Sequence, residues 1–190
     1  YWSPSGGSSA REPLYFPSDV AENLQQRQLL SGWLRKADVL GPEVVAVNLF
    51  SARLMYRACE IFVDLVQMCG GTVLPLTLQA DDQDVVRLWK RFRPTMVMGS
   101  PGRLLQLARF LPRPEPAPLR VLFAGESLHP SARAVLDEAF DGPQYVSVLG
   151  SAETGIWGFQ RPEDPLNRFW APQEIVELEV ADSGTLLVSN

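Results

Sequence analysis

The sequence predicts an α/β fold in which helices cover a mostly parallel sheet and a β-hairpin follows at the C-terminal end. Two observations support this prediction. Short apolar segments alternate with amphipathic helical segments between residues 44 and 149, which is the order that a parallel sheet with helical crossovers requires. The first long strand, residues 44–50, is also almost continuously apolar, which is typical of a strand buried on both faces.

The composition excludes several classes of protein. The 190 residues are 46% hydrophobic and 21% charged, which is close to the globular average and sufficient for a substantial core. A net charge of -5 argues against a nucleic-acid partner. No apolar run is long enough for a membrane span, and residues 1–7 lack the features of a signal peptide. We therefore expect a cytoplasmic protein without a membrane partner; the oligomeric state is left open.

The N-terminal segment predicts a loop, a short strand and a helix. Residues 3–13 are rich in Ser, Gly and Pro, and residues 14–16 are apolar enough for a strand. Asp19 and Glu22 have the spacing of a capping box, which predicts a helix beginning there. The residues expected on the apolar face of this helix are Val20, Leu24, Leu30, Trp33, Leu34 and Ala37.

The central segments follow one another as strand and helix. A helical stripe runs from Leu54 to Cys69, and Gly70 and Gly71 end it. Residues 112–118 contain four prolines and predict a surface connection. Strands are expected at 44–50, 72–76, 95–98, 119–123 and 145–149, and further helices at 81–92, at 101–111 and from Pro130.

The alternation stops after Gly150. Residues 151–173 predict a long irregular loop, and loops of this length are usually functional or disordered. Residues 174–181 and 185–189 predict a hairpin across an Asp-Ser-Gly turn.

The two cysteines and the single histidine offer little chemistry. Cys59 and Cys69 lie ten residues apart in one helical pattern, about 15 Å along the axis, so they cannot form a disulfide bond. We expect buried free thiols in a reducing compartment. His129 precedes Pro130 and is expected at the start of a helix, and a zinc site would need more ligands than these three residues.

Four segments fall where parallel strands end, which is where α/β sheets bind ligands. The glycines and hydroxyls of residues 3–13 suit a polyphosphate, although composition alone favours a flexible linker. Residues 124–128 follow a strand directly, and Gly125 permits close approach of a ligand; an ordinary turn is equally compatible.

The other two segments carry a carboxylate and an aromatic ring. Glu153 lies between small residues after a strand and suits a Mg²⁺ ion beside phosphates, while the alternative is a solvated side chain in a turn. Phe50 ends the first long strand, where it would wall a ligand pocket or belong to the core.

Taken in order, these segments resemble the large N-terminal domain of the adenylate-forming superfamily, which includes acyl- and aryl-CoA ligases, luciferases and peptide-synthetase adenylation domains. The most similar branch is the phenylacetate-CoA ligase-like one. Residues 5–13 resemble the ATP phosphate loop, and residues 44–75 resemble the stretch of strand, aromatic residue and long helix that ends in "Gly-Gly-Thr-Val-Leu-Pro". Residues 119–128 resemble the adenine-side segment with its "Gly-Glu-x-Leu" motif. Residues 149–153 resemble "Tyr-Gly-x-Thr-Glu" and residues 184–188 "Gly-Glu-Leu-x-Val".

The resemblance implies ATP-dependent activation of a small carboxylic acid, aromatic or otherwise, as an acyl-adenylate. Transfer to a thiol such as coenzyme A would follow. It also implies Mg²⁺ and a set of site residues. Ser5, Gly6, Gly7, Ser8 and Ser9, with Arg11, would hold the phosphates; Gly125, Glu126, Ser127, Gly150 and Ser151 would contact the nucleotide; Phe50, Ser51 and Ala124 would line the acyl pocket; and Glu153 would be catalytic by binding the metal.

The sequence departs from the superfamily pattern in ways that keep other interpretations open. Ala10 and Arg11 replace the closing Gly and Lys of the phosphate loop, and Leu149 and Ala152 replace a Tyr and a Thr. We expect residues 1–190 to be a single partial domain that lacks the small C-terminal domain with its catalytic Lys, and so to be inactive alone. The alternatives are a non-catalytic nucleotide- or acyl-AMP-binding relative and an unrelated parallel α/β protein.

Overall fold

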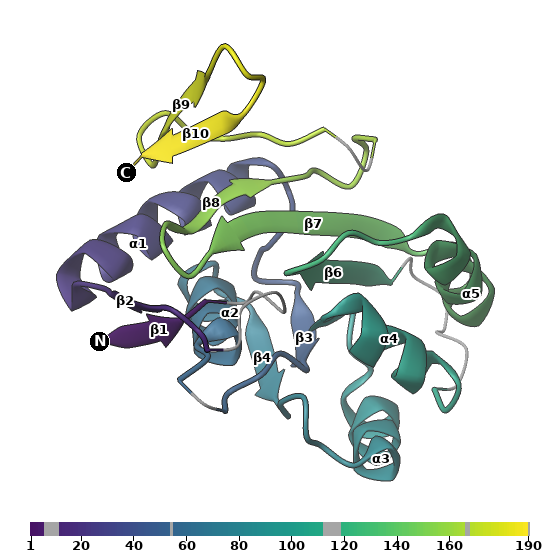
Figure 1. Cartoon of the computed structure of the whole chain (residues 1–190). Helices are drawn as coiled ribbons and strands as arrows, with labels where there is room; N and C mark the ends of the chain where they lie inside the picture. The colour runs from purple at the N-terminus through teal and green to yellow at the C-terminus, as the bar shows by residue number, and fades with distance from the viewer. Residues whose placement is uncertain (6–11, 54, 112–118, 166–167, 190) are drawn as a thin grey trace.

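A six-stranded sheet forms the centre of the molecule in the computed structural model, which describes residues 1–5, 12–53, 55–111, 119–165 and 168–189. The strand order is β4-β3-β5-β6-β7-β8, with the first five strands parallel and β8 antiparallel to β7 (Figure 1). This confirms the predicted fold class. The bounds are β3 (Val45–Asn48), β4 (Thr72–Pro75), β5 (Met96–Gly99), β6 (Arg120–Ala124), β7 (Gln144–Ser151) and β8 (Gly155–Phe159).

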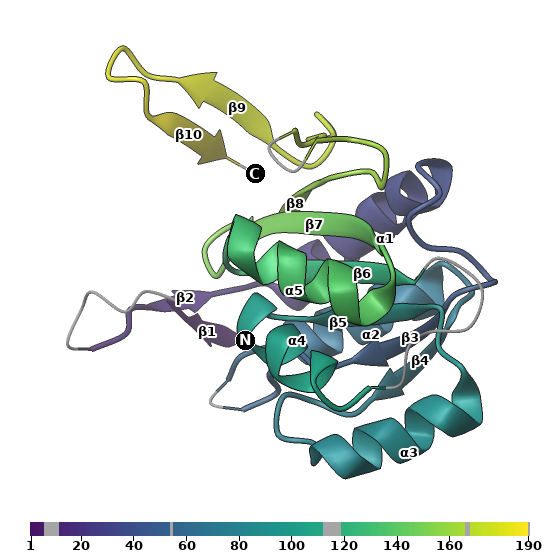
Figure 2. The same ribbon diagram turned by 90° about the vertical axis from the view of Figure 1, so that its right-hand side faces the viewer.

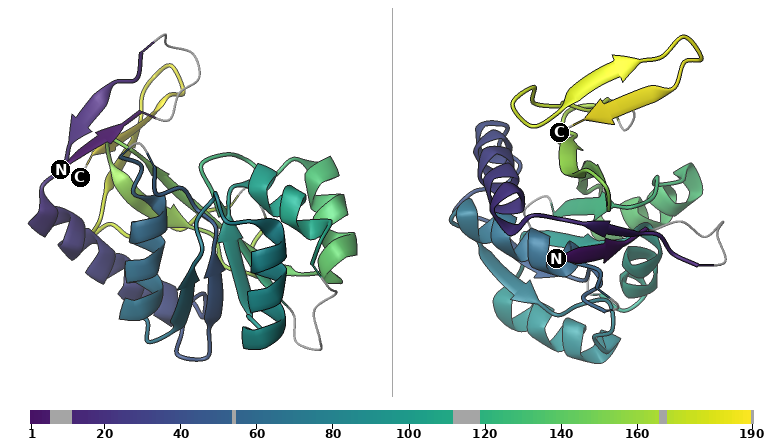
Figure 3. Two further views of the ribbon diagram at one scale, coloured as in Figure 1. Left: turned by 90° about the horizontal axis from the view of Figure 1, so that it is seen from below. Right: turned by 60° about the vertical axis from the view of Figure 1, so that its left-hand side comes forward.

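Helices cover both faces of this sheet (Figure 3). Because successive side chains of a strand point to opposite faces, Met96 and Met98 pack under one helical layer and Val97 under the other. One layer consists of α1 (Val20–Lys36) and α2 (Ala58–Met68), and the other of α3 (Asp82–Phe92), α4 (Pro101–Ala108) and α5 (Pro130–Phe140).

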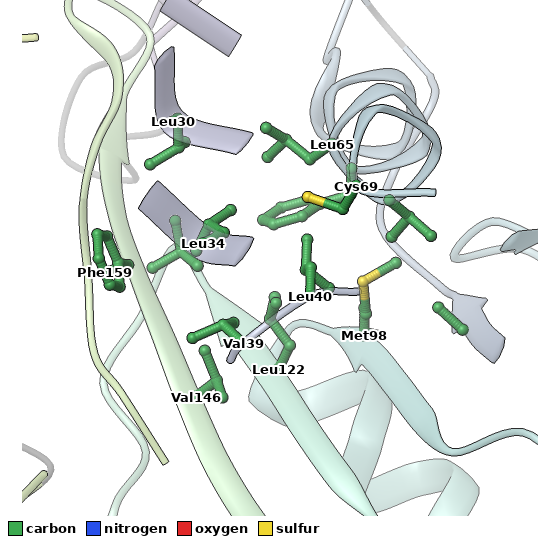
Figure 4. Close-up of a cluster of buried hydrophobic side chains, with 14 of the residues drawn as sticks. Leu30, Leu34, Val39, Leu40, Leu65, Cys69, Met98, Leu122, Val146 and Phe159 are labelled. Atoms are coloured by element: carbon green, nitrogen blue, oxygen red, sulfur yellow. The ribbon is translucent and has the colours of Figure 1, made fainter. Parts of the chain in front are cut away.

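The core on the α1 and α2 side joins segments that are distant in the sequence (Figure 4). Leu30 and Leu34 of α1 pack with Leu65 of α2, with Leu122 of the sheet and with Phe159 at the end of β8. All five side chains are at most 2% exposed. The first helix of the chain is therefore held by the last strand of the sheet.

Two small hairpins lie outside the central sheet (Figure 2). β1 (Trp2–Pro4) pairs with β2 (Tyr15–Pro17), and β9 (Glu177–Val180) pairs with β10 (Leu186–Ser189), both antiparallel. The expected strand near residues 14–16 and the expected C-terminal hairpin are thus confirmed.

Helix α1 begins as predicted but buries a different set of residues. The Asp19 carboxylate accepts hydrogen bonds from the backbone N–H groups of Ala21 and Glu22, at 2.7 and 3.1 Å. Val20 and Leu24, expected on the apolar face, are 65% and 44% exposed. Arg27 is buried instead because it forms an ion pair with Asp64 of α2, and Ser31 is buried beside it.

Helix α2 begins later than the sequence predicts, and Leu54 lies outside the described residues. Met55 is exposed and has a left-handed backbone conformation (φ 64°). The start of the helix is fixed by Asn48, a fully buried polar residue at the end of β3. Its side chain donates to the Cys59 carbonyl at 2.9 Å and accepts from the Phe50 N–H at 3.1 Å.

The prediction of an irregular loop over residues 151–173 is wrong in part, because this segment contains β8. Phe159 at the end of β8 also exchanges two backbone hydrogen bonds with Trp170, at 3.0 and 2.8 Å. The sequence pattern does not predict this strand, because two of the five residues of β8 are glycines and glycine is a poor strand former.

The cysteines are buried free thiols, as predicted. Burial raises the pKa of Cys69 to about 11, and its Sγ donates to the Ser31 carbonyl. In the described part of the chain, none of the helices combines the length and the apolar character needed to cross a bilayer.

Candidate functional site

A cavity of about 720 Å³ lies at the edge of the sheet where the parallel strands β6 and β7 end. This cavity, called the strand-end cavity below, is bounded by the β1–β2 hairpin, by α1 and by the beginning of α2. Its wall includes apolar side chains from α2, β7 and β8 and carboxylates from α1 and from two loops. The residues used below are Asp19, Glu22, Gln26, Leu29, Arg57, Ile61, Phe62, Ala124, Gly125, Val148, Gly150, Ser151, Ala152, Glu153, Gly155, Ile156 and Glu174.

The strand-end cavity brings together some of the residues that the sequence singles out. The predicted residues in its wall are Ala124, Gly125, Gly150, Ser151 and Glu153. Glu126 and Ser127 are exposed beside it, outside the wall. Gly6, Gly7, Ser8, Ser9 and Arg11 lie outside the described residues.

Phe50 and Ser51 lie behind the cavity rather than in its wall. The Phe50 ring is 5% exposed and stacks on Phe62, with ring centroids 4.3 Å apart and an interplanar angle of 12°. Phe62 itself is part of the wall. The Ser51 carbonyl accepts the N–H of Cys59 at 3.1 Å, so this residue helps to start α2. An aromatic wall is present, but it comes from the helix and not from the strand end.

Glu153 is carried by a tight turn between β7 and β8. The Ser151 hydroxyl oxygen accepts the Thr154 N–H at 3.2 Å and lies 3.0 Å from the Thr154 hydroxyl. The Gln26 side chain of α1 donates to the Thr154 carbonyl at 2.9 Å. No sequence pattern marks Gln26, because its partner is 128 residues away. This contact fixes the turn, and with it Glu153, against α1.

Gly150 is needed for the close approach of the two strands at this turn. A Cβ atom at this position would lie 2.5 Å from the Gly155 carbonyl oxygen and 2.9 Å from the Ile156 Cα. Both are backbone atoms, which cannot rotate away.

We therefore expect Gly150→Ala to lower the free energy of unfolding by about 1–3 kcal/mol, as overpacking does. Urea unfolding measures this change. Gly102→Ala in α4 is the matched control, because a Cβ there meets no atom within 4 Å; it should stabilise by about 0.5 kcal/mol. Equal effects of the two substitutions would contradict the close approach.

Ser5 and Tyr56 hold the end of the β1–β2 hairpin at which the connecting segment begins. Leu14 donates its N–H to the Ser5 hydroxyl oxygen at 3.0 Å, and the Ser5 N–H donates to the Leu14 carbonyl at 2.6 Å. The Tyr56 hydroxyl donates to the Ser5 carbonyl at 3.4 Å. Ser5 thus closes the segment that carries the predicted phosphate loop.

The described wall of the strand-end cavity is acidic. Four carboxylates belong to it, from Asp19, Glu22, Glu153 and Glu174. Arg57 is the only cation among the described residues of the wall. Its Nε and Nη2 atoms donate hydrogen bonds to the Glu60 carboxylate, at 3.2 and 2.8 Å. The hydrogen bonds from Arg57 lower the pKa of Glu60. The described residues alone therefore leave little positive charge for an anion.

A second cavity, of about 800 Å³, lies at the other end of α1 and is called the tryptophan cavity below. Trp33 and Lys36 of α1 line it together with Phe159, Arg161 and Trp170. Lys36 Nζ lies 4.8 Å from the centre of the Trp33 ring, and the Arg161 guanidinium lies 4.1 Å from that of Trp170. Its wall thus combines aromatic rings and two cations with the carboxylate of Glu174.

Asp164 connects two residues of the tryptophan cavity, Arg161 and Trp170, by hydrogen bonds. Its carboxylate accepts from Arg161 Nε at 3.0 Å and from Trp170 Nε1 at 2.7 Å. The hydrogen bond from the Arg161 side chain is the main cause that lowers the pKa of Asp164 to about 2.

This pKa predicts a stability loss in acid. Because the folded-state pKa lies below the ordinary value of 3.8, the contribution of Asp164 is fully present above that value and is lost as the pH falls towards 2. Urea unfolding over this range should show the loss, and Asp164→Asn should remove it. Glu163→Gln, which changes an exposed neighbour that also contacts Arg161, should preserve it. An unchanged profile in Asp164→Asn would exclude the assignment.

Solved structures of adenylate-forming enzymes share this fold. Over 99% of this chain, 2-hydroxyisobutyryl-CoA ligase in complex with 2-HIB-AMP and CoA matches with a TM-score of 0.76 and 13% identity. ATP-bound MatB from Rhodopseudomonas palustris matches over 98% of this chain, with 0.64 and 14%. The luciferase-like enzyme of the nonluminescent Zophobas morio mealworm matches over 86%, with 0.58 and 16%.

The chain therefore has the fold of part of the adenylate-forming enzymes, the superfamily that its ordered motifs resemble. It spans less than half of the length of these proteins: 44% of the ligase, 36% of MatB and 37% of the luciferase-like enzyme. No family model and no curated protein matches the sequence. The phenylacetate-CoA ligase-like branch stays a prediction.

Proposed function

We propose that this chain is the central part of an enzyme that activates a small carboxylic acid with ATP and transfers the acyl group to a thiol. The single observation that carries the proposal is the strand-end cavity. It places Gly125, Gly150, Ser151 and Glu153 around one space, in a fold shared with enzymes solved with ATP, an acyl-AMP and CoA. The chain spans under half of those enzymes, so the complete activity belongs to a longer protein.

The reaction has two balanced steps. A carboxylate oxygen of the acid attacks the α-phosphorus of ATP, so that a P–O bond forms while the bond to the leaving pyrophosphate breaks. The thiol sulfur then attacks the acyl carbon; AMP leaves and the thiol gives up its proton. Both steps develop charge on oxygen atoms, so electrostatic stabilisation is the main task of the site.

The acidic wall is compatible with a metal-bound polyphosphate. Mg²⁺ is commonly held by one or two carboxylates together with substrate phosphates. Among the described residues, no three His, Cys, Asp or Glu side chains gather as a metal site. Glu153, which follows the end of strand β7, would hold the ion as the protein's carboxylate ligand, and Mg²⁺ would supply charge neutralisation there. Arg11, outside the described residues, is the cation proposed for the phosphates.

The acyl pocket would be the apolar part of the same cavity. Ile61 and Phe62 of α2 face Ala124, Val148 and Ile156 of the sheet. Phe50 supports Phe62 from behind by ring stacking. A flat aromatic acid fits between an aromatic side chain and a sheet face, which supports the aromatic substrate class. Coenzyme A is the proposed thiol acceptor.

Pyrophosphate exchange tests the first step. The longer protein that contains this chain is incubated with ATP, Mg²⁺ and labelled pyrophosphate over a panel of aromatic and aliphatic acids. We expect acid-dependent label in ATP, with aromatic acids preferred. If no acid supports exchange under conditions where a known ligase works, the enzymatic proposal fails.

A second candidate is a binding protein that has lost catalysis. The observation that favours it is Ala152, which lines the strand-end cavity where the superfamily motif has a threonine hydroxyl. Calorimetry separates the two candidates, because a binder holds ATP or an acyl-AMP without turnover. Restoring the hydroxyl with Ala152→Thr should raise exchange if the site is catalytic.

A further inference from the structure

Gln26 of α1 meets the turn between β7 and β8 with both polar atoms of its side-chain amide. Helix α1 runs beside β8 (Figure 1), and Nε2 of Gln26 donates to the Thr154 carbonyl at 2.9 Å. Its Oε1 atom fills the space beside Gly155, since a Cβ added there would overlap that oxygen and lie 3.1 Å from Cδ. Because a carbonyl oxygen only accepts hydrogen bonds, Thr154 also fixes which end of the amide faces it.

Gly155 is the residue that makes room for this amide. Its backbone is left-handed (φ 67°), a conformation that glycine adopts without strain. A larger residue at this position would push the Gln26 side chain away from Thr154. The contact therefore depends on Gln26 and Gly155 together, although the two residues are distant in the sequence.

The strand pairing that leads into this turn is irregular. The register of β7 against β8 shifts by one residue between Leu149 and Gly150, so that Trp157 is the extra residue on β8. A bulge of this kind bends its strand and redirects the side chains near it, and bulges are common beside active sites. The direction of the turn is thus set by its contact with α1 as well as by the sheet.

Glu153, in the middle of the turn, depends on this backbone for its position. Its side chain is exposed, and within the part of the chain that the structure describes no hydrogen bond or ion pair holds it. It still belongs to the wall of the strand-end cavity, as Gln26 does. A turn that moved away from α1 would therefore carry the carboxylate with it.

We propose that Gln26 is a positioning residue of the strand-end cavity: by holding the turn against α1, it places the Glu153 carboxylate where a metal-bound polyphosphate needs it. The inference rests on the proposed function for the metal role of Glu153. Gln26 acts through the Thr154 backbone and needs no contact with the reacting atoms. Removing a partner that orients a metal ligand typically costs about 10–100-fold in metal affinity or activity.

Two other roles for Gln26 lead to different expectations. A residue that binds the acid directly would change the KM for the acid and leave the binding of the metal–nucleotide complex unchanged. A residue that only stabilises the fold would change the unfolding midpoint, without any effect that depends on the metal or on Glu153. The experiments below separate these roles.

A double-mutant cycle on the 190-residue chain tests the contact itself. Gln26→Ala and Gly155→Ala should each lower the urea concentration at the unfolding midpoint. The double variant should lose less than the sum, because Gly155→Ala already displaces the amide. Gln28 is the matched control, since it is an exposed glutamine of α1 that lines neither cavity. The effects of Gln28→Ala and Gly155→Ala should add.

Calorimetry on the longer protein tests the positioning role, with ATP titrated in Mg²⁺ and, separately, in EDTA. We expect Gln26→Ala to weaken the affinity for Mg²⁺–ATP about tenfold and to leave the affinity for metal-free ATP unchanged. In the Glu153→Gln background, Gln26→Ala should have no further effect, because the carboxylate that it positions is gone. Gln28→Ala should leave both affinities unchanged, and circular dichroism confirms that each variant is folded.

Three results would overturn the proposal. These are additive losses for Gln26→Ala and Gly155→Ala, an affinity of Gln26→Ala for Mg²⁺–ATP within twofold of the unchanged protein, and an equal weakening by Gln26→Ala with and without the Glu153 carboxylate. A different result sinks the proposed function alone: Mg²⁺–ATP binds and responds to Gln26→Ala, but the longer protein supports no pyrophosphate exchange with any acid. If Mg²⁺–ATP does not bind the unchanged protein, both fail.

Discussion

Glu153→Gln in the longer protein is expected to slow acyl-adenylate formation by at least about a hundredfold, the loss typical of removing one electrostatic contact to a transition state. The amide keeps the size of the side chain but has no negative charge for Mg²⁺. Because Ser151, Thr154 and Gln26 hold the turn by other atoms, the substitution should leave the fold intact. Pyrophosphate exchange measures the rate.

Two further measurements separate a metal role from a general loss of charge. Raising the Mg²⁺ concentration should recover part of the rate of Glu153→Gln, because the weakened ligand set needs more free ion. Glu138→Gln removes an exposed carboxylate from α5, outside both cavities, and should leave the rate unchanged. A rate in Glu153→Gln equal to that of the unchanged enzyme would remove Glu153 from the site.

Asp82→Asn is expected to lower the free energy of unfolding by about 3 kcal/mol, the cost of leaving a buried charge without its partner. Asp82, in the first turn of α3, forms an ion pair with Arg103 of α4 and accepts from Gln106 at 2.9 Å. The Arg103 side chain is only 2% exposed, and its other bond is to the Ala80 carbonyl at 2.8 Å.

The same helix turn supplies the control. Asp84 forms an ion pair with Arg87, but both side chains are more than half exposed, so Asp84→Asn should cost less than about 1 kcal/mol. Both acids lie near the helix N-terminus, so the effect of the helix dipole cancels in the comparison. Urea unfolding gives both values, and equal losses would show that the buried pair is not stabilising. The double variant Asp82→Asn/Arg103→Met should recover part of the loss, since no buried charge remains.

The sequence predicts the layers of this fold well because the signal is local. Strands such as 44–50 are apolar on both faces, and the cap at Asp19 and the proline at the first helical position, Pro130, mark where helices begin. It misses features that depend on distant partners. Arg27 in α1 is buried only because Asp64 meets it, and β8 forms only because β7 offers an edge.

The candidate site shows the same division. Residues that directly follow a strand, such as Gly125 and Glu153, are found in the cavity wall because strand ends define that edge. Phe50 is a candidate for the wall from the sequence, but its ring is buried and stacks on Phe62 of α2, which lines the cavity in its place. No local sequence pattern marks Gln26 or the residues that line the tryptophan cavity. Their partners are distant in the sequence and come near only because α1 packs on β8.

The hydrogen bond from Gln26 to Thr154 has a consequence for the way this protein is made. It joins the second turn of the first helix to the last turn of the central sheet, across 128 residues. On a ribosome that adds roughly 5–20 residues per second, α1 is exposed for several seconds or more before its partner strand exists. The strand-end cavity closes only when this long loop closes, so it is among the last features to form. A nascent chain that has emerged only as far as the end of β7 would therefore hold all five parallel strands and still lack part of the binding site.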